Sequence, residues 1–154
     1  MAKRAKIGDV VQILTSGGVA YAQFTHKHSR FGPLLAIFDG FHSVVPDDFS
    51  QVVAERPKFS AFFPLQPALN EGLLSVVANV PVAASNKEFP MFRTRVVTPG
   101  GQCGPWWVWD GENEEMLERE LTSSEKRYSL RGIISAPLLL DRIEKGYRPE
   151  THDV

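Results

Sequence analysis

The chain has 154 residues, a length that suits one domain with a core large enough to fold without disulfides, so we expect a single domain over residues 1–154. It carries 17 basic and 18 acidic residues, and the resulting net charge of -1 gives no broad positive field for non-specific nucleic-acid binding. The single cysteine, Cys103, excludes an intramolecular disulfide, and no apolar run approaches the roughly 20 residues of a membrane span. Because the opening residues also lack the apolar run of a secretory signal, we expect a cytoplasmic protein.

Three apolar segments near the N-terminus predict an antiparallel meander. Residues 9–14 and 19–24 have the composition of strands and are joined through Gly17 and Gly18, which favours a hairpin. Residues 33–40 supply a third apolar run that ends in a turn signal and can pair with the second strand. The result is a small curved sheet, with a barrel-like form as one possibility.

The middle of the chain predicts shorter elements. Residues 47–54 follow a proline and begin with two acids, which predicts a short helix, while residues 59–65 are expected to be extended. Residues 75–80 have the β-branched content of a buried strand. Residues 81–90 are the most linker-like stretch of the chain.

All three tryptophans fall within residues 106–109. Side chains alternate in a strand, so Trp107 and Trp109 should lie on one face, and Trp106 and Val108 on the other. Since both faces are apolar, this tryptophan strand either lies between two layers or presents one aromatic face to a partner. Residues 91–97 alternate apolar and basic side chains before a turn, which predicts a second hairpin with the tryptophan strand.

The C-terminal third begins with acidic residues and ends with a helix. Residues 112–120 contain five glutamates, and both a helix and an edge strand fit them. Thr122 and Glu125 have the spacing of a capping box. Residues 135–146 predict a helix that should cover one side of the tryptophan strand with a face formed by Leu139 and Ile143. The fold class is therefore α+β: a curved, mostly antiparallel sheet backed by a C-terminal helix.

Two catalytic motifs find no support. The run around Cys103 resembles the cysteine motif of papain-like proteases, but there the cysteine directly precedes a tryptophan, whereas here Trp106 stands in that position. Gly17 and Gly18 lie between two strands rather than before a helix, which is typical of a turn and not of a phosphate site. We therefore predict no catalytic residue.

Two further sites were weighed against structural explanations. His26 and His28 would share a strand face, with Asp39 or His42 as further ligands, but a second tight ligand pair is missing, so we predict neither a metal site nor a cofactor. Arg93 and Arg95 would share a strand face beside the tryptophans, an arrangement that suits nucleic acid. Cation–π packing inside the fold would use the same two arginines.

Segments from both ends of the chain are similar to the bacterial immunity protein 26 family. They are residues 6–13, 20–23, 37–39, 121–125 and 137–146. The resemblance implies a cytoplasmic α+β protein that neutralises a cognate polymorphic toxin by binding it, without catalysis.

Under that interpretation the acidic stretch gains a purpose, because toxins that act on nucleic acids present basic sites that an acidic surface can block. A solvated face accounts for the same glutamates. The candidate partner-binding residues are Glu112, Glu114, Glu115, Glu118 and Trp106. We expect a binding protein rather than an enzyme; the alternatives are a small barrel-like module that binds nucleic acid or peptide, and an enzyme whose site the sequence does not reveal.

Overall fold

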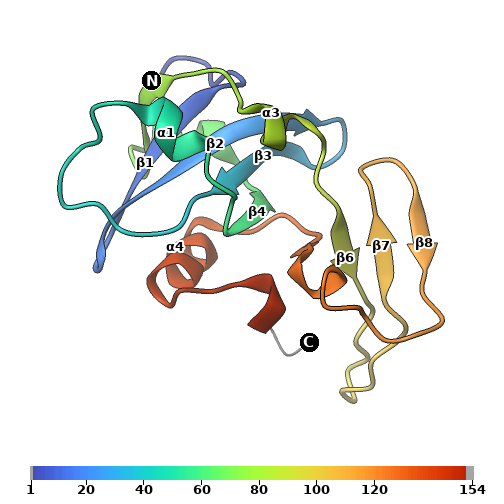
Figure 1. Cartoon of the computed structure of the whole chain (residues 1–154). Coiled ribbons are helices and arrows are strands. Elements are labelled where there is room, and N and C mark those ends of the chain that lie inside the picture. Colours follow the sequence, from blue (N-terminus) through green and yellow to red (C-terminus); the bar gives the residue numbers. More distant parts are fainter. Residues whose placement is uncertain (1, 152–154) are drawn as a thin grey trace.

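The computed structural model describes residues 2–151 and contains two sheets flanked by short helices (Figure 1). Sheet A has the strand order β4-β3-β2-β1-β5, and sheet B has the order β8-β7-β6-β9. The strands of sheet A are β1 (Asp9–Thr15), β2 (Gly18–His28), β3 (Gly32–Ile37), β4 (Phe59–Phe62) and β5 (Ser75–Asn79). Those of sheet B are β6 (Phe92–Thr94), β7 (Trp107–Trp109), β8 (Glu114–Met116) and β9 (Ser129–Leu130). The α+β class is confirmed, but neither sheet closes into a barrel.

The predicted N-terminal meander is confirmed. β1 pairs antiparallel with β2, and β2 pairs antiparallel with β3. At the first turn the Thr15 hydroxyl donates to the Gly18 carbonyl at 2.7 Å. Gly18 has a φ of 133°, and a Cβ atom there would lie 3.0 Å from Phe41, so both the backbone conformation and the space favour glycine.

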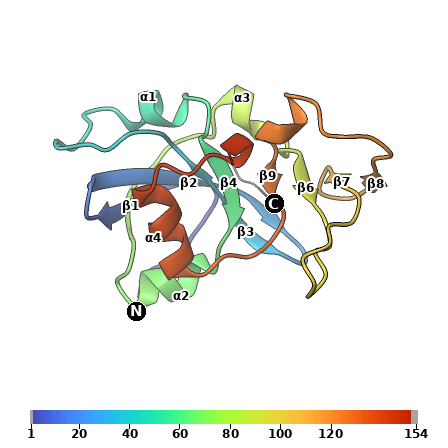
Figure 2. The same ribbon diagram turned by 90° about the horizontal axis from the view of Figure 1, so that it is seen from below.

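The predicted C-terminal helix, α4 (Ala136–Glu144), forms and begins at Ser135, whose side chain accepts a hydrogen bond from the Leu138 N–H. Its Leu139 and Ile143 join the largest buried cluster, which lies on one face of sheet A. The expectation that this helix covers the tryptophan strand is wrong: α4 crosses sheet A near β1, away from β6, β7 and β8 (Figure 2). Residues 129–134 run along the edge of β4 and so direct α4 toward sheet A.

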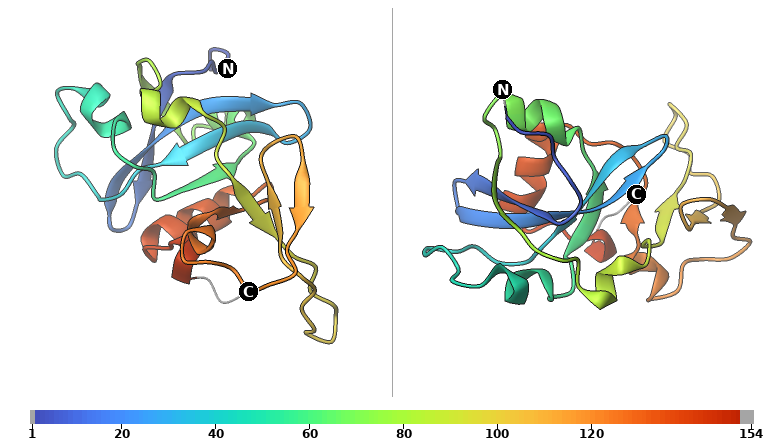
Figure 3. Two further views of the ribbon diagram at one scale, coloured as in Figure 1. Left: turned by 45° about the vertical axis from the view of Figure 1, so that its right-hand side comes forward. Right: turned by 90° about the horizontal axis from the view of Figure 1, so that it is seen from above.

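The other helices cover both faces of sheet A (Figure 3). α2 (Leu65–Asn70) adds Leu65, Ala68 and Leu69 to the cluster beneath α4. On the opposite face lie α1 (Phe49–Val53), which confirms the predicted short helix, and α3 (Ala84–Lys87). Within residues 2–151, none of the helices has the length and apolarity needed to cross a bilayer.

Sheets A and B meet in an aromatic cluster, which we call the junction cluster. Its buried members are Leu34 and Phe62 from sheet A and Phe92 and Trp109 from sheet B, with Phe31 and Phe89 packed against them. Two hydrogen bonds join β4 to β9 and the segment that follows it: Ser60 N–H donates to Ser129 Oγ at 2.8 Å, and Ile134 N–H donates to the Phe62 carbonyl at 2.9 Å. The junction therefore combines apolar burial with backbone pairing.

β5 differs from its prediction. Residues 75–79 form a strand, but it lies at the edge of sheet A, and its Ser75, Val76 and Asn79 are exposed. Val77 and Ala78 pack partly against the cluster under α1. The expectation of a buried strand is wrong, because β-branched composition indicates a strand without indicating whether a neighbour lies on its outer side.

Sheet B confirms the second predicted hairpin and shows which of the two predicted structures, helix or edge strand, the acidic segment forms. β6 pairs antiparallel with β7, and β8 is an edge strand beside β7, so the strand alternative holds for residues 114–116. The capping box also forms: Thr122 N–H donates to Glu125, and Glu125 N–H donates to the Thr122 hydroxyl. A short 3-10 helix, η1 (Glu125–Arg127), begins there.

Candidate functional site

The tryptophan strand is covered on both faces at Trp106, Val108 and Trp109, which is the first of the two predicted alternatives, whereas Trp107 stays partly accessible. Trp109 is buried in the junction cluster. Trp106 and Val108 lie on the opposite face, in a second cluster with Leu117. Two of the three indoles are thus committed to the interior, with Trp106 only 5 % exposed.

Trp106 is enclosed by two arginines. The guanidinium of Arg93 lies 4.5 Å from its ring centroid, and that of Arg95 lies 4.3 Å away. Arg93 is 2 % exposed and donates to the carbonyls of Tyr128 at 3.2 Å and Pro149 at 2.7 Å. Burial lowers the pKa of Arg93. Arg93 and Arg95 therefore come together as cation–π packing inside the fold, where Arg93 cannot reach a phosphate.

Trp107 is the accessible indole. It is half-buried, and its cross-strand partner in β8 is Met116, which is 43 % exposed. Because paired residues project from the same face, the two side chains form an apolar patch at the end of sheet B. Sequence reasoning did not single out this pair; the available signal was that Met116 interrupts a run of glutamates.

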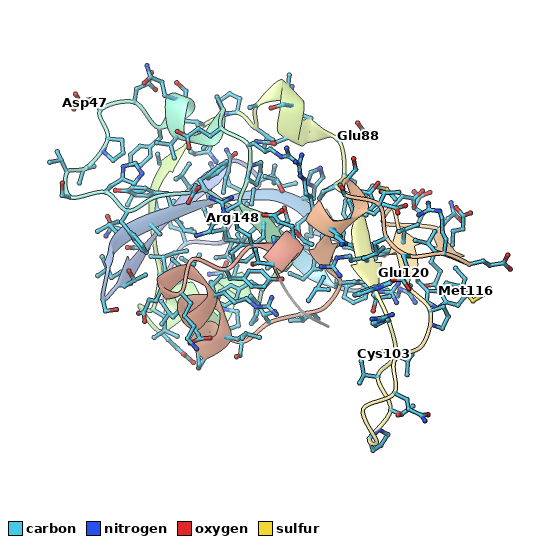
Figure 4. The ribbon with its side chains drawn as sticks, turned by 60° about the horizontal axis from the view of Figure 1, so that its bottom comes forward. Asp47, Glu88, Cys103, Met116, Glu120 and Arg148 are labelled. Atoms are coloured by element: carbon cyan, nitrogen blue, oxygen red, sulfur yellow. The ribbon has the colours of Figure 1, made fainter. Side chains whose placement is uncertain are left out.

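The four candidate glutamates lie before and after Met116 in the sequence; by strand alternation Glu114 shares the face of Met116, and Glu115 projects from the opposite face of β8. Glu112, Glu114, Glu115 and Glu118 are all exposed. Within residues 2–151, one of these four glutamates forms an ion pair: the Glu114 carboxylate lies 2.9 Å from the Arg131 guanidinium. Figure 4 shows Met116 and Glu120 pointing outward at this end of the molecule. We call this set of residues the β8 surface: Trp107, Glu112, Glu114, Glu115, Met116 and Glu118.

Two turns fix the shape of the β8 surface. The Asp110 carboxylate accepts hydrogen bonds from the N–H groups of Asn113 at 2.8 Å and Glu112 at 2.9 Å, and these bonds lower the pKa of Asp110. Beyond β8, Arg119 donates two hydrogen bonds to Glu125, which, together with the Thr122 N–H, lower the pKa of Glu125 to about 2. Both ends of the acidic segment are thus held in place.

A cleft of about 1110 Å³ is a second candidate site, lined by residues of both sheets, of the loop at residues 56–58, of α3 and the segment that follows it, and of the C-terminal segment. Its lining includes four basic side chains (Arg56, Lys58, Arg127, Arg148) and four acidic ones (Asp39, Glu88, Asp110, Glu150). These charges balance in number, so the lining of the cleft carries no net charge of either sign.

Asp39 organises one end of this cleft. Its carboxylate pairs with Arg148, which lies near the middle of the molecule in Figure 4, and with Lys58 at 3.7 Å. Desolvation raises the pKa of Asp39, but the hydrogen bonds from Arg148 and Gly40 and the charge of Lys58 outweigh it, so the pKa is lowered overall. This arrangement ties the C-terminal segment to the end of β3.

His26 also lines the cleft, next to a hydroxyl group. Its Nε2 donates to the Lys87 carbonyl at 2.8 Å, so its Nδ1 accepts from the Thr25 hydroxyl at 2.9 Å. A catalytic hydroxyl and its histidine base form the same kind of hydrogen bond, and a carboxylate then orients the histidine. Here a backbone carbonyl, that of Lys87, takes the place of the carboxylate, and Thr25 is only 7 % exposed. The geometry favours a structural role that anchors the end of α3.

His28 is committed to the fold in the same way. Its Nδ1 accepts from the N–H groups of Arg30 and Phe31, and its Nε2 donates to the Gly111 carbonyl at 2.7 Å. The two histidines weighed as a metal pair therefore use both ring nitrogens for internal bonds. In the part of the chain that the structure describes, no group of three or more His, Cys, Asp or Glu side chains could hold a metal ion.

Cys103 lies on the hairpin that follows β6 and projects from the molecule (Figure 4). Its side chain is exposed, and Val97 is its partner in an isolated antiparallel bridge. The turn predicted at residues 98–101 forms, with Gly101 N–H donating to the Thr98 carbonyl at 2.8 Å.

Comparison of the chain with protein-family models, curated proteins and solved structures finds no match. A function therefore has to be inferred from the surfaces described above. Of these, the β8 surface combines an accessible aromatic side chain with unbalanced charge, which the cleft does not.

Proposed function

We propose that this protein binds another protein through the β8 surface, and that the partner is a toxin that it neutralises. The observation that carries the proposal is that an exposed edge strand carries glutamates on both of its faces and an accessible Trp107–Met116 pair on one of them. Tryptophan is enriched among the residues that dominate binding energy, and charged rims around such residues select the partner.

The charge of this surface specifies the kind of partner. Glu112, Glu115 and Glu118 are exposed, and no ion pair within residues 2–151 neutralises them. A basic surface would satisfy these carboxylates and would be attracted from a distance. Toxins that cut or modify nucleic acids need basic sites to hold phosphates, so an acidic inhibitor can both find and cover such a site.

The rigidity of the surface supports the same role. Asp110 holds the turn before β8, and the Arg119–Glu125 pair holds the chain after it. A preorganised surface loses less conformational entropy on binding than a mobile one, which favours high affinity. The choice of a toxin as the partner follows the resemblance proposed from sequence segments to the immunity protein 26 family, a resemblance that no family-model match supports.

Binding to the toxin-like product of a neighbouring gene tests the proposal by isothermal titration calorimetry. The Glu115→Lys/Glu118→Lys double variant should bind at least about 10-fold more weakly, and wild-type affinity should fall steeply with salt. The matched control is Glu55→Lys/Glu71→Lys, which reverses two exposed glutamates outside the β8 surface and should bind as the wild type does. Equal affinity of both double variants would reject the acidic surface as the interface.

Trp107→Ala tests the apolar centre of the same surface. If the indole docks the partner, affinity should fall by about 10-fold or more while the free energy of unfolding changes little. Coexpression adds a cellular readout, because the wild-type protein should relieve a growth defect caused by the toxin and this variant should relieve it less. A loss of about 3 to 5 kcal/mol in the free energy of unfolding without a change in affinity would place Trp107 in the scaffold instead.

A further inference from the structure

We propose that β5 is an interface for a second copy of this chain, in which two β5 strands pair antiparallel about a two-fold axis and join two copies of sheet A. This inference concerns a different edge from the β8 surface and does not depend on the proposed function. It follows from a comparison of the sheet edges that the fold leaves open.

The other outer edge of sheet A is already occupied. The Phe62 carbonyl of β4 accepts from Ile134 N–H at 2.9 Å, and Phe62 and Ile133 form a parallel bridge. The Ser60 N–H of the same strand donates to Ser129 Oγ. Residues 129–134 therefore shield β4 from pairing with another molecule.

The edge of sheet B formed by β8 is protected by charge. In a two-fold antiparallel pair of β8 strands, Glu114 and Glu115 of one copy would face the same acidic strand of the other. Like charges opposite one another destabilise such a pair. β8 can accept a basic partner, but it resists a second copy of itself.

β5 has neither form of protection. It contains no charged residue, and within residues 2–151 its backbone pairs with β1 on one side only. Val76 is 44 % exposed, and two more exposed apolar side chains flank the strand: Leu73, just before it, and Ile7, whose carbonyl accepts from Asn79 Nδ2 at 3.4 Å. An exposed, neutral, β-branched edge strand is the kind that pairs with another strand.

A second copy is the occupant that this edge fits best. In a two-fold antiparallel pair each strand meets its own sequence, so an uncharged strand meets no repulsion and needs no complementary partner. Val76 would then lie between two neighbouring strands, β1 of its own copy and β5 of the second copy. A basic or acidic protein would gain no electrostatic advantage at β5.

The size of the edge sets the expected strength. β5 has five residues, and a bulge leaves Val77 outside the β1 ladder, which shortens the regular stretch. A pair of such strands falls below the roughly 1,200 Å² of a standard specific interface. We therefore expect a monomer–dimer equilibrium with a dissociation constant in the micromolar range or weaker.

Sedimentation velocity of the full chain over a concentration series tests this inference without any toxin. The weight-average mass should rise toward that of a dimer, and Val76→Lys should weaken dimerisation at least about 10-fold by placing a charge at the edge. Val96→Lys is the matched control, because Val96 is also exposed but lies outside β5, and it should dimerise as the wild type does. Glu115→Lys should also leave dimerisation unchanged, which separates this interface from the β8 surface.

Amide hydrogen exchange of the wild type gives a second measurement that needs no variant. The outward N–H groups of β5 should exchange more slowly at high protein concentration than at low concentration. A mass that stays monomeric at all concentrations, or dimerisation of Val76→Lys at wild-type strength, would overturn the inference.

Discussion

Sheets A and B are stabilised in different ways. Sheet A contains the longest strand, the 11-residue β2, and it buries an apolar cluster on each face. Sheet B has strands of two or three residues and depends on the junction cluster, on the arginines around Trp106 and on the Arg131–Glu114 ion pair. The comparison teaches that sheet A is the scaffold, while the proposed binding surface lies on a sheet that neighbouring elements hold in place.

The largest effect is expected at the junction cluster. Trp109→Ala should lower the free energy of unfolding by about 3 to 5 kcal/mol, because it opens a cavity between the sheets. Chemical denaturation measures this loss, and Trp107→Ala, which removes a half-buried indole from the same strand, should cost about 1 kcal/mol. Equal losses would mean that the junction does not hold sheet B in place.

Removal of Arg93 should have the next largest effect. Arg93→Ala leaves the carbonyls of Tyr128 and Pro149 without their donor and removes one face of the Trp106 packing, so we expect a loss of about 2 to 3 kcal/mol. Arg93→Lys should restore only part of it, because an ammonium lacks the planar fork. Hydrogen exchange should quicken in residues 147–151 before sheet A responds; uniform quickening would contradict the local role.

The turn between β7 and β8 offers a smaller, sharply controlled test. Gly111 has a φ of 103°, and a Cβ atom there would lie 2.7 Å from the Phe89 ring, whereas Gly101 has a φ of 82° in open space. Gly111→Ala should therefore lose about 1 to 2 kcal/mol, more than Gly101→Ala, where strain alone acts. Thermal unfolding of the two variants compares them directly. Equal shifts in Tm would show that the Phe89 ring moves aside without a measurable loss of stability.

The smallest effect is a pH dependence in the chain after β8. The folded-state pKa of Glu125 is about 2 against an ordinary value of 4.5, so its stabilisation is present above pH 4.5 and is lost as the pH falls toward 2. The difference in unfolding free energy between the wild type and Glu125→Gln should thus be constant near neutral pH and shrink through this window. A difference that does not change with pH would exclude the Arg119 interaction as its source.

Local patterns predicted the local parts of the fold. The meander, the capping box at Thr122 and the helix beginning at Ser135 depend on residues close together in the sequence, and all three form. The packing of α4 and the exposure of β5 depend on how distant segments meet, and both expectations were wrong. No local pattern states that residues 129–134 pair with β4 and so direct the last helix.

The same limit applies to the candidate site. Alternation placed Trp106 and Trp107 on opposite faces correctly, but it could not tell which indole would be covered. That depended on Arg93 and Arg95 enclosing Trp106, an outcome that sequence analysis could state only as an alternative to nucleic-acid binding. The exposure of the glutamates followed from their composition, whereas the accessible Trp107–Met116 pair emerged from strand register.

The position of α4 after all the strands in chain order has a consequence for biosynthesis. The meander of residues 9–37 leaves the ribosome well before Leu139 and Ile143, which complete its largest apolar cluster. Until then the nascent chain exposes an apolar surface that chaperones recognise and that favours aggregation. A stop codon between residues 131 and 135 should therefore yield an insoluble product, even though every strand of both sheets would already have been translated.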